Sequence, residues 1–405
     1  MLGKDISAPR KPLSLFHFKT AAQVPNYIYL DNNSTTKPDS LVVQAMVNFL
    51  TSNYGNPSSS HLVGRIANTS IENARQKLSD LLKCNPRDLI FTSGATESIN
   101  LALKGVVHAS FKTNPHIITL KTEHPAVLDT CKYLEGIGCA ITYLPVEKDG
   151  LIDLLTFEKA IRPNTILACI MLVNNETGVI QPIKLLTEIA HKMGVLFMTD
   201  ATQAIGKLPV DVSDLETDLL CLSGHKFYGP KGIGALYIKS KTKMQITKQM
   251  HGGNQEGRLR SGTLNVPGIV GLGEAAAIAC QEMQRDKERI GGLRDYLESE
   301  LLKIKGVFVN GNIKNRLYNV SNLCFEGIDA DSIMASLENI MVSNGSACTS
   351  ALVEPSHVLI AMGLTEEQAF SSIRFSLGRF TTKDEIDITI KHYSELLHKN
   401  EYQKA

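Results

Sequence analysis

Short apolar runs alternate with longer stretches whose apolar positions recur at helical spacing along most of the chain. This alternation is typical of α/β proteins, in which buried and mainly parallel strands are joined by helices. The expected strands cover residues 89–92, 117–120, 141–144, 166–172, 196–199, 219–222 and 234–238. The expected helices cover residues 70–82, 98–107, 125–135, 183–192 and 281–302. The pattern therefore predicts an α/β fold built on a mainly parallel sheet.

The pattern changes after about residue 283, where a charged helix leads into shorter α+β segments with expected strands at 318–325 and 373–376. We therefore expect a large domain at residues 36–282 and a smaller α+β domain at residues 283–405. Residues 1–35 are expected to form an N-terminal extension and part of the small domain.

Composition and charge argue against several function classes. The 42 Lys and Arg residues nearly balance 41 acidic ones, so the net charge of +1 provides no field for nucleic acid or an anionic membrane. The longest apolar runs fall far short of the roughly 18 residues that span a membrane. The eight cysteines form no CxxC pair, so we expect no metal site and a reducing compartment. The first 20 residues lack an apolar segment of secretory length, and Asp5 argues against a mitochondrial transit segment, so the cytoplasm is expected.

A lysine at a strand end is the first candidate for chemistry. Lys226 follows the expected strand at 219–222 through Ser223, Gly224 and His225, and a Gly/Pro-rich turn comes next. A lysine in this place can form a Schiff base with an aldehyde, and small or hydroxylated neighbours allow a phosphate to approach closely. A surface lysine in a turn is the alternative for this segment taken alone.

Two other expected strands end in residues that suit the same ligand. Asp200 could keep a pyridine nitrogen protonated, or it could cap a short helix that begins at Ala201. Residues 91–97 read FTSGATE, so a glycine turn leads into a helix whose free N–H groups, with the Thr96 hydroxyl, suit an anion. Because ligands of such folds bind at the carboxyl ends of parallel strands, the three segments together indicate one binding site.

These segments belong to a longer series that resembles the NifS/IscS-like cysteine desulfurases, which are pyridoxal-phosphate (PLP) enzymes of fold type I in the class-V aminotransferase family. The resemblance covers nearly the whole chain. The matching stretches are YLDNNSTT (29–36), YGNPSS (54–59), FTSGATES (91–98), TEHPAVLDT (122–130), VNNETG (173–178), DATQAIGKLPVD (200–211), SGHKFYGPKGIGALY (223–237), RSGT (260–263), SNGSACTSALVEPSHVL (343–359) and SSIRFSLGRFT (371–381). The resemblance implies a PLP-dependent transferase fold.

The resemblance also implies how the cofactor ring is held. Lys226 would be the Schiff-base lysine, Asp200 the partner of the pyridine nitrogen and His124 the residue stacked over the ring. Asn175 and Gln203 would hydrogen-bond the ring substituents. Each has a structural alternative: His124 could cap the helix that begins at Pro125, Asn175 could fix a turn, and Gln203 could be solvated.

Phosphate and substrate contacts follow from the same resemblance. The phosphate would be bound by Ala95, Thr96, Ser223, Gly224 and His225. Thr263 would reach the phosphate of the neighbouring subunit, which implies a homodimer. Arg374, with Asn175, would bind the substrate carboxylate, because a planar guanidinium suits two oxygens. A structural ion pair is the alternative for Arg374.

Cys348 differs from the other cysteines because it lies among small and polar residues at 343–356. Such a composition favours a mobile, exposed loop, and an accessible thiol that can ionise is able to attack sulfur. An inert cysteine in an ordinary turn is the alternative. The resemblance implies that Cys348 is the nucleophile, and that members with this long loop pass sulfur to scaffold proteins.

The expected function is therefore PLP-dependent removal of sulfur from L-cysteine, which gives L-alanine and a persulfide on Cys348. The persulfide would pass to an acceptor for iron–sulfur cluster assembly or tRNA thiolation, and it could contact a cluster on a scaffold partner. The alternatives are a selenocysteine lyase, another class-V PLP enzyme and a non-catalytic homologue that binds sulfur-assembly partners. The Gly/Arg order in residues 252–263 departs from the family pattern, so Arg258 is given no role. The chain also ends short of the tail with which housekeeping members dock the scaffold, which leaves the acceptor open.

Overall fold

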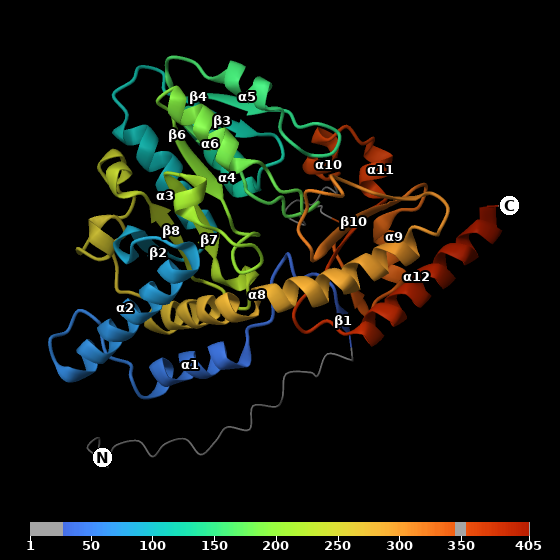
Figure 1. Cartoon of the computed structure of the whole chain (residues 1–405), viewed down its shortest axis with the longest axis horizontal. Coiled ribbons are helices and arrows are strands. Elements are labelled where there is room, and N and C mark those ends of the chain that lie inside the picture. The colour runs from blue at the N-terminus through green and yellow to red at the C-terminus, as the bar shows by residue number, and fades with distance from the viewer. Residues whose placement is uncertain (1–26, 345–353, 405) are drawn as a thin grey trace, which may run out of the picture.

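The larger part of the protein is built on a seven-stranded sheet, seen at the centre left of Figure 1, in a computed structural model that describes residues 27–344 and 354–404. The strand order is β2-β8-β7-β6-β5-β3-β4. The strands are β2 (Leu89–Thr92), β3 (His116–Leu120), β4 (Ala140–Leu144), β5 (Thr165–Cys169), β6 (Leu196–Asp200), β7 (Leu219–Ser223) and β8 (Gly234–Ile238). All seven expected strands of this sheet are present, which confirms the predicted α/β class.

One strand of this sheet runs against its neighbours. β8 is antiparallel to both β2 and β7, whereas β3, β4, β5, β6 and β7 pair in parallel. Because β8 is antiparallel to both of its neighbours, β2 runs in the same direction as β6 and β7. The carboxyl ends of β2, β6 and β7 therefore meet at one edge of the sheet, as the strand-end motifs require.

Alternate residues of each strand face different layers of helices. Leu219 and Cys221 pack in the apolar cluster that includes α3 and α4, whereas Leu220 and Leu222 pack in the cluster that includes α2 and α8. The helices of this part are α1 (Ser40–Thr51), α2 (Leu62–Leu82), α3 (Ala95–Ala109), α4 (Pro125–Gly136), α5 (Leu154–Ala160), α6 (Ile183–Lys192) and α7 (Val212–Leu215). Burial on both faces explains why the strands read as continuous apolar runs.

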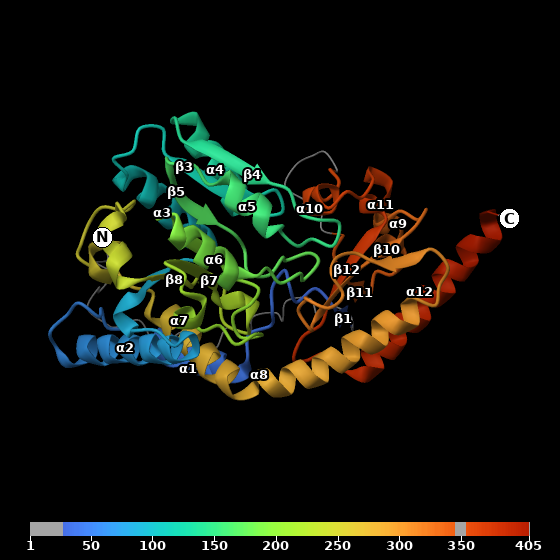
Figure 2. The same ribbon diagram turned by 45° about the horizontal axis from the view of Figure 1, so that its top comes forward.

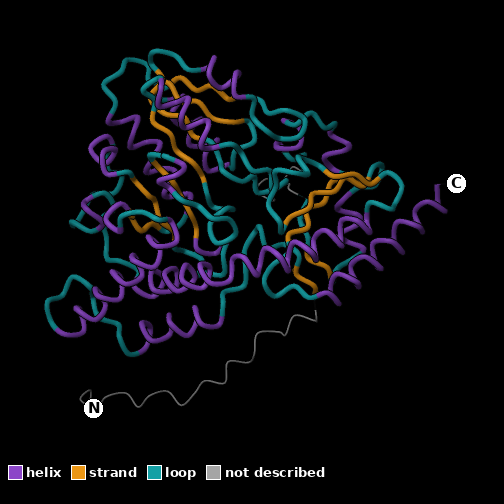
Figure 3. Tube along the Cα trace, in the orientation of Figure 1, coloured by secondary structure: helices purple, strands orange, loops and turns teal. Residues whose placement is uncertain are grey.

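A smaller part lies at the other end of the molecule, and Figure 3 shows its strands apart from the large sheet. Its antiparallel sheet has the order β12-β10-β9, and β1 pairs in parallel with β11 beside it. Its elements are β1 (Ile28–Tyr29), β9 (Val307–Val309), β10 (Val320–Phe325), β11 (Ile340–Met341), β12 (Ser372–Ser376), α9 (Ala330–Ser336), α10 (His357–Ala361), α11 (Glu366–Phe370) and α12 (Lys383–Lys404).

Helix α8 (Val266–Leu301) runs along both parts, as Figure 2 shows. It begins 15 residues before the predicted helix at 281–302, where Asn265 caps it by accepting from the Gly268 N–H. The N-terminal half of α8 packs against α1 and α2, so its apolar side chains are buried. This half therefore lacks the charged pattern that marks the C-terminal half of the helix in the sequence. The proposed boundary between residues 282 and 283 falls inside α8, and the domain division stays a proposal.

No helix in the described ranges combines the length and hydrophobicity that crossing a membrane requires.

Candidate active site

A cavity of about 560 Å³ opens at the edge where β2, β6 and β7 end. Its wall includes side chains from the large sheet, from the segment after β1 and from β12 of the smaller part. The predicted site residues that line it are Ala95, Thr96, His124, Asn175, Asp200, Gln203, Ser223, His225, Lys226 and Arg374. Predicted site residues as far apart along the chain as Ala95 and Arg374 therefore share one pocket.

Lys226 ends the single 3₁₀ turn that follows β7. Its Nζ donates to the backbone oxygens of Asn33 at 2.8 Å and Ser34 at 2.7 Å. Burial, with the nearby Arg374 cation, lowers the pKa of Lys226 to about 8, although Asp200 and Asp31 act in the opposite direction. The amine is therefore close to the neutral form that a nucleophile or a base requires.

Asp200 is the last residue of β6 and is buried. Its Oδ1 accepts from the Thr202 N–H at 2.9 Å, but turns rather than a helix follow at Ala201. The predicted helix-cap alternative is therefore wrong, and the carboxylate lies in the cavity wall.

His124 does cap a helix, since its Nδ1 accepts from the Ala126 N–H at 3.1 Å at the start of α4. The ring also lines the cavity. Burial lowers its pKa, and because Nδ1 accepts, the proton of the neutral ring lies on Nε2. The structure thus combines capping with an imidazole N–H that is available for chemistry.

An anion fits at the end of the cavity formed by the start of α3. Gly94, with φ of +155°, makes no side-chain cap there, so the first N–H groups of the helix are not taken by its cap residue. The Thr96 and Ser223 hydroxyl groups line the same cavity. His225 also lines it, and burial lowers its pKa to about 4. A phosphate group suits this donor set.

Two predicted phosphate ligands do not line this cavity, and one of them, Thr263, was predicted to contact the phosphate of the neighbouring subunit. The N–H of Gly224 donates to the Ile233 oxygen at 3.0 Å, and Gly224 does not line the cavity. The glycine is needed for packing instead, since a Cβ there would lie 3.1 Å from the Pro230 oxygen. Thr263 is exposed and lines a separate cavity of about 200 Å³, so a single chain does not bring it to Lys226.

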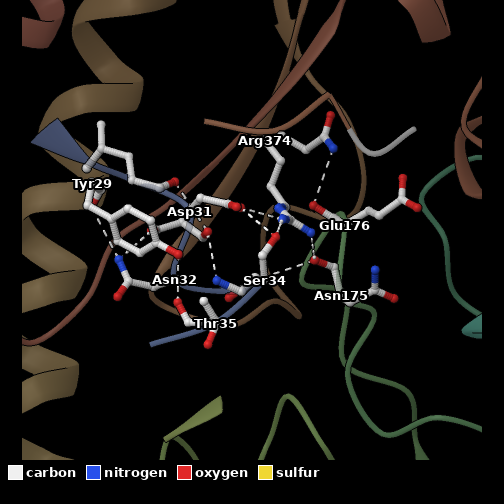
Figure 4. Close-up of polar contacts among 12 residues, drawn as sticks. Tyr29, Asp31, Asn32, Ser34, Thr35, Asn175, Glu176 and Arg374 are labelled. Atoms are coloured by element: carbon white, nitrogen blue, oxygen red, sulfur yellow. Dashed lines mark hydrogen bonds and ion pairs between the residues drawn. The ribbon is translucent and has the colours of Figure 1, made fainter. Parts of the chain in front are cut away.

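Arg374 is held in place on three sides (Figure 4). Its Nη2 donates to Asp31 Oδ1 at 2.6 Å and to Ser34 Oγ at 2.7 Å, and its Nη1 donates to the Asn175 oxygen at 3.0 Å. The predicted ion pair is therefore present. However, Arg374 Nε is buried and has no hydrogen-bond partner among the described residues, and the side chain lines the cavity. An open donor of this kind fits a polar ligand.

The structural alternatives for Asn175 and Gln203 are not found. The turn beyond β5 is fixed by Asn174, whose Oδ1 accepts from the Glu176 and Thr177 N–H groups at 2.9 Å. Gln203 is only 4% exposed, so it is not solvated, and its Nε2 donates to the Asn33 oxygen at 2.9 Å.

The sequence interpretation missed the segment that follows β1. The backbone oxygens of Asn33 and Ser34 accept from Lys226, and Asp31 pairs with Arg374. The signal was available, since the polar run Asp31–Thr35 directly follows the apolar residues 28–30.

Cys348 lies outside the described residues, but both flanks of its segment lie beside the cavity. Ser343 and Arg374 exchange backbone hydrogen bonds of 3.3 and 2.6 Å. On the other side, Ser356 Oγ donates to the buried Glu176 carboxyl, which is adjacent to Asn175.

The chain matches the family model described as aminotransferase class-V over residues 28–388. It is 50% identical over 367 residues to the cysteine desulfurase IscS of Escherichia coli O139:H28, which covers 90% of this chain and 91% of that protein. The same values relate it to cysteine desulfurase IscS of Shigella boydii serotype 18.

Solved structures agree with this match. A structure titled NifS-like protein has a TM-score of 0.86 at 39% identity and covers 92% of this chain and 99% of that one. A structure titled SspA in complex with cysteine has a TM-score of 0.77 at 37% identity and covers 88% of this chain and 100% of that one.

Proposed function

Because the chain belongs to the class-V aminotransferase family and is a PLP-dependent cysteine desulfurase, we propose that the cavity at the ends of β2, β6 and β7 is where it desulfurates L-cysteine. The observation that carries this proposal is the joint presence of the Lys226 amine, the Asp200 carboxylate and the Arg374 guanidinium in one pocket. No other described pocket holds these three groups.

The cavity wall provides a partner for each part of the cofactor. Lys226 would bond the aldehyde carbon, and Asp200 would face the ring nitrogen. The start of α3, with Thr96 and Ser223, would hold the phosphate. When bound, PLP supplies an electron sink that makes the Cα–H and Cβ–S bonds of cysteine easier to break.

Arg374, Lys226 and His124 have the remaining roles in the reaction. Arg374 binds the carboxylate of cysteine and thereby orients its Cα–H bond. The neutral Lys226 amine removes the Cα proton, which its pKa of about 8 permits near neutral pH. His124 moves a proton through Nε2 to or from the thiols.

Cys348 is the proposed acceptor of the sulfur. Its thiolate attacks the substrate sulfur, so an S–S bond forms while the Cβ–S bond breaks. The bonding electron pair stays on Cβ, which takes a proton, and L-alanine leaves. Covalent geometry keeps the Cα atom of Cys348 within about 14 Å of the Cα atom of Asn344, because the two residues are four positions apart along the chain.

The described cysteines suit this role poorly. Cys131, Cys169 and Cys221 are buried, and burial raises the pKa of each thiol. A thiol with a raised pKa is a weak nucleophile at neutral pH. Cys280 is exposed and lies on α8, so it is a matched control for Cys348.

The test is mass spectrometry of the intact protein after addition of L-cysteine without a reductant. We expect the parent protein and Cys280→Ala to gain one sulfur atom on Cys348. Cys348→Ala should bind PLP and cysteine but gain no sulfur, and alanine release should fall at least about a hundredfold. Normal turnover by Cys348→Ala would refute the assignment of the nucleophile.

We also propose that the protein is a homodimer that passes sulfur to an acceptor protein in the cytoplasm. Exposed apolar side chains on α1 and α2 support self-association: Leu41, Val43, Val47, Leu50, Leu62, Val63 and Ile66. Thr263, which is exposed in the single chain, is then free to reach the partner's cofactor. The acceptor is an iron–sulfur scaffold or another sulfur carrier.

A further inference from the structure

A second buried lysine lies behind the cavity and takes no part in the chemistry above. Lys207 follows β6 in the turns that begin at Ala201, and it is only 3% exposed. It does not line the cavity, so it cannot touch a ligand there.

The Lys207 amine reaches the cavity through one intermediary. Its Nζ donates to Gln203 Oε1 at 2.9 Å, while Gln203 Nε2 donates to the Asn33 oxygen at 2.9 Å. The same Asn33 oxygen accepts from Lys226 Nζ at 2.8 Å. A continuous chain of hydrogen bonds thus joins Lys207 to the amine of Lys226.

The two contacts of Gln203 fix its orientation. The amide oxygen faces Lys207, which only donates when it is protonated, and the amide nitrogen must face the Asn33 oxygen, which only accepts. One N–H of this NH₂ group remains for the cavity that Gln203 lines. Without Lys207, only the contact with the Asn33 oxygen would hold the amide in this orientation.

The charge of Lys207 is not balanced by a described neighbour. No described carboxylate lies within ion-pair distance of its Nζ, and the nearby cations Lys226 and Arg374 oppose its protonation. Burial lowers the pKa of Lys207 to about 7. A buried cation without a partner is costly, so an anionic ligand in the adjacent cavity would restore its proton.

We propose that Lys207 is a positioning residue that fixes the N–H edge of Gln203 toward the cofactor and supplies, through Gln203, the counter-charge for an anionic ring oxygen. This inference rests on the proposed role of Gln203 as a ligand of the ring substituents. Lys207 acts through Gln203 and is not itself a catalytic residue.

The test compares the PLP-loaded parent protein with Lys207→Met, which keeps the length of the side chain and removes the charge. The first measurement is the pH midpoint at which the visible band of the bound cofactor changes. Loss of a nearby cation favours the protonated cofactor, so we expect this midpoint to rise by about one pH unit, a tenfold change in the dissociation constant of the proton. The second is the equilibrium constant for PLP release, which we expect to rise about tenfold.

The titratable groups that line the same cavity are unchanged in this comparison, namely Glu97, His124, Asp200, His225, Lys226, Lys231 and Arg374. Lys132→Met removes an exposed lysine on α4 and should leave both values unchanged. Lys207→Gln keeps a donor toward Gln203 and removes the charge, so its midpoint should rise while PLP release changes less than in Lys207→Met. Circular dichroism of each variant identifies any that fail to fold.

A double-mutant cycle tests the route through Gln203. In a Gln203→Leu background, Lys207→Met should change the midpoint and the PLP constant much less than in the parent. Equal effects in both backgrounds would overturn the route, and unchanged values in Lys207→Met would overturn the inference. A parent protein with no visible band in the presence of PLP would instead contradict the proposed function of the cavity.

Discussion

The Asp31 carboxylate accepts a hydrogen bond from the same Arg374 guanidinium that is proposed to bind the carboxylate of cysteine. Asp31 accepts from Arg374 Nη2 at 2.6 Å, and the ion pair is largely buried. Arg374 therefore cannot offer both of its terminal nitrogens to a substrate while Asp31 stays in place. Asp31 is an internal competitor that also keeps the guanidinium from being a buried, unpaired cation.

Replacement of Asp31 with Asn should affect both substrate binding and pH dependence. Removal of the competing charge should lower KM for cysteine severalfold. Asp31 also raises the pKa of Lys226, so its loss should lower that pKa below about 8 and leave more neutral amine at a given pH. The limb of kcat that rises with pH should therefore move to lower pH, as measured by initial rates of alanine release from about one pH unit below neutrality to about two units above it.

Asp80→Asn, an exposed change on α2, is the control and should leave the profile where it is. A large rise in KM for Asp31→Asn would contradict competition and would mean that Asp31 orients Arg374 for the substrate.

Individual site residues could be predicted from the sequence where a motif lies at the end of a strand. Lys226, Asp200 and Thr96 follow apolar runs, and the parallel sheet brings such ends together. Gly224 could not be resolved in this way. Whether its backbone N–H is already used by the Ile233 oxygen depends on packing that the local sequence does not encode.

At the scale of elements, the start of α10 anchors the segment that carries Cys348. Ser356 caps α10 by accepting from the Leu359 N–H, and it donates to the buried Glu176 carboxyl. His357 Nε2 also contacts the Glu123 oxygen at 2.9 Å. One short helix thus ties the far end of this segment to the two loops that carry His124 and Asn175.

Ser356→Ala should weaken this anchor. Loss of the cap and of one buried hydrogen bond should lower the free energy of unfolding by about 1–2 kcal/mol, as measured by urea denaturation. Persulfide formation on Cys348 should slow severalfold, while cysteine binding, followed by the cofactor spectrum, is retained.

The matched change is Thr365→Ala, which removes the exposed N-cap of α11. It should cost similar stability without slowing persulfide formation. Equal slowing in the two variants would mean that Ser356 acts only through general stability.

Elements with strong local patterns were predicted well, and those that depend on distant partners were not. The observed bounds of β8 and α6 are the same as those expected from the sequence, residues 234–238 and 183–192. By contrast, β1 and β11 are two-residue strands that exist only because residues 28–29 pair with residues 340–341. No periodicity can develop in two residues, so such a pair has no local signal.

At the scale of the whole molecule, the apolar face of α1 and α2 provides the test of self-association. Leu50 on α1 is 64% exposed, and Leu155 on α5 is 63% exposed. A charge at a buried interface is costly, so Leu50→Glu should weaken the dimer at least about tenfold, as measured by sedimentation. Retention of PLP should fall with it, because Thr263 would lose its partner.

Leu155→Glu places the same charge on an equally exposed leucine of another face and should leave the molecular mass unchanged. A parent protein that sediments as a single chain, with PLP firmly bound, would contradict the dimer.

The antiparallel strand β8 also sets the order in which the protein can be completed during synthesis. β2 pairs only with β8, so residues 89–92 remain an open edge until residue 238 has left the ribosome. The residues that hold Lys226 come from the start of the chain, and Arg374 comes from near its end. A nascent chain therefore carries Lys226 long before it has a complete pocket. Binding of PLP is therefore among the last steps in the synthesis and folding of the protein. Truncated translation products should lack the visible colour of the bound cofactor.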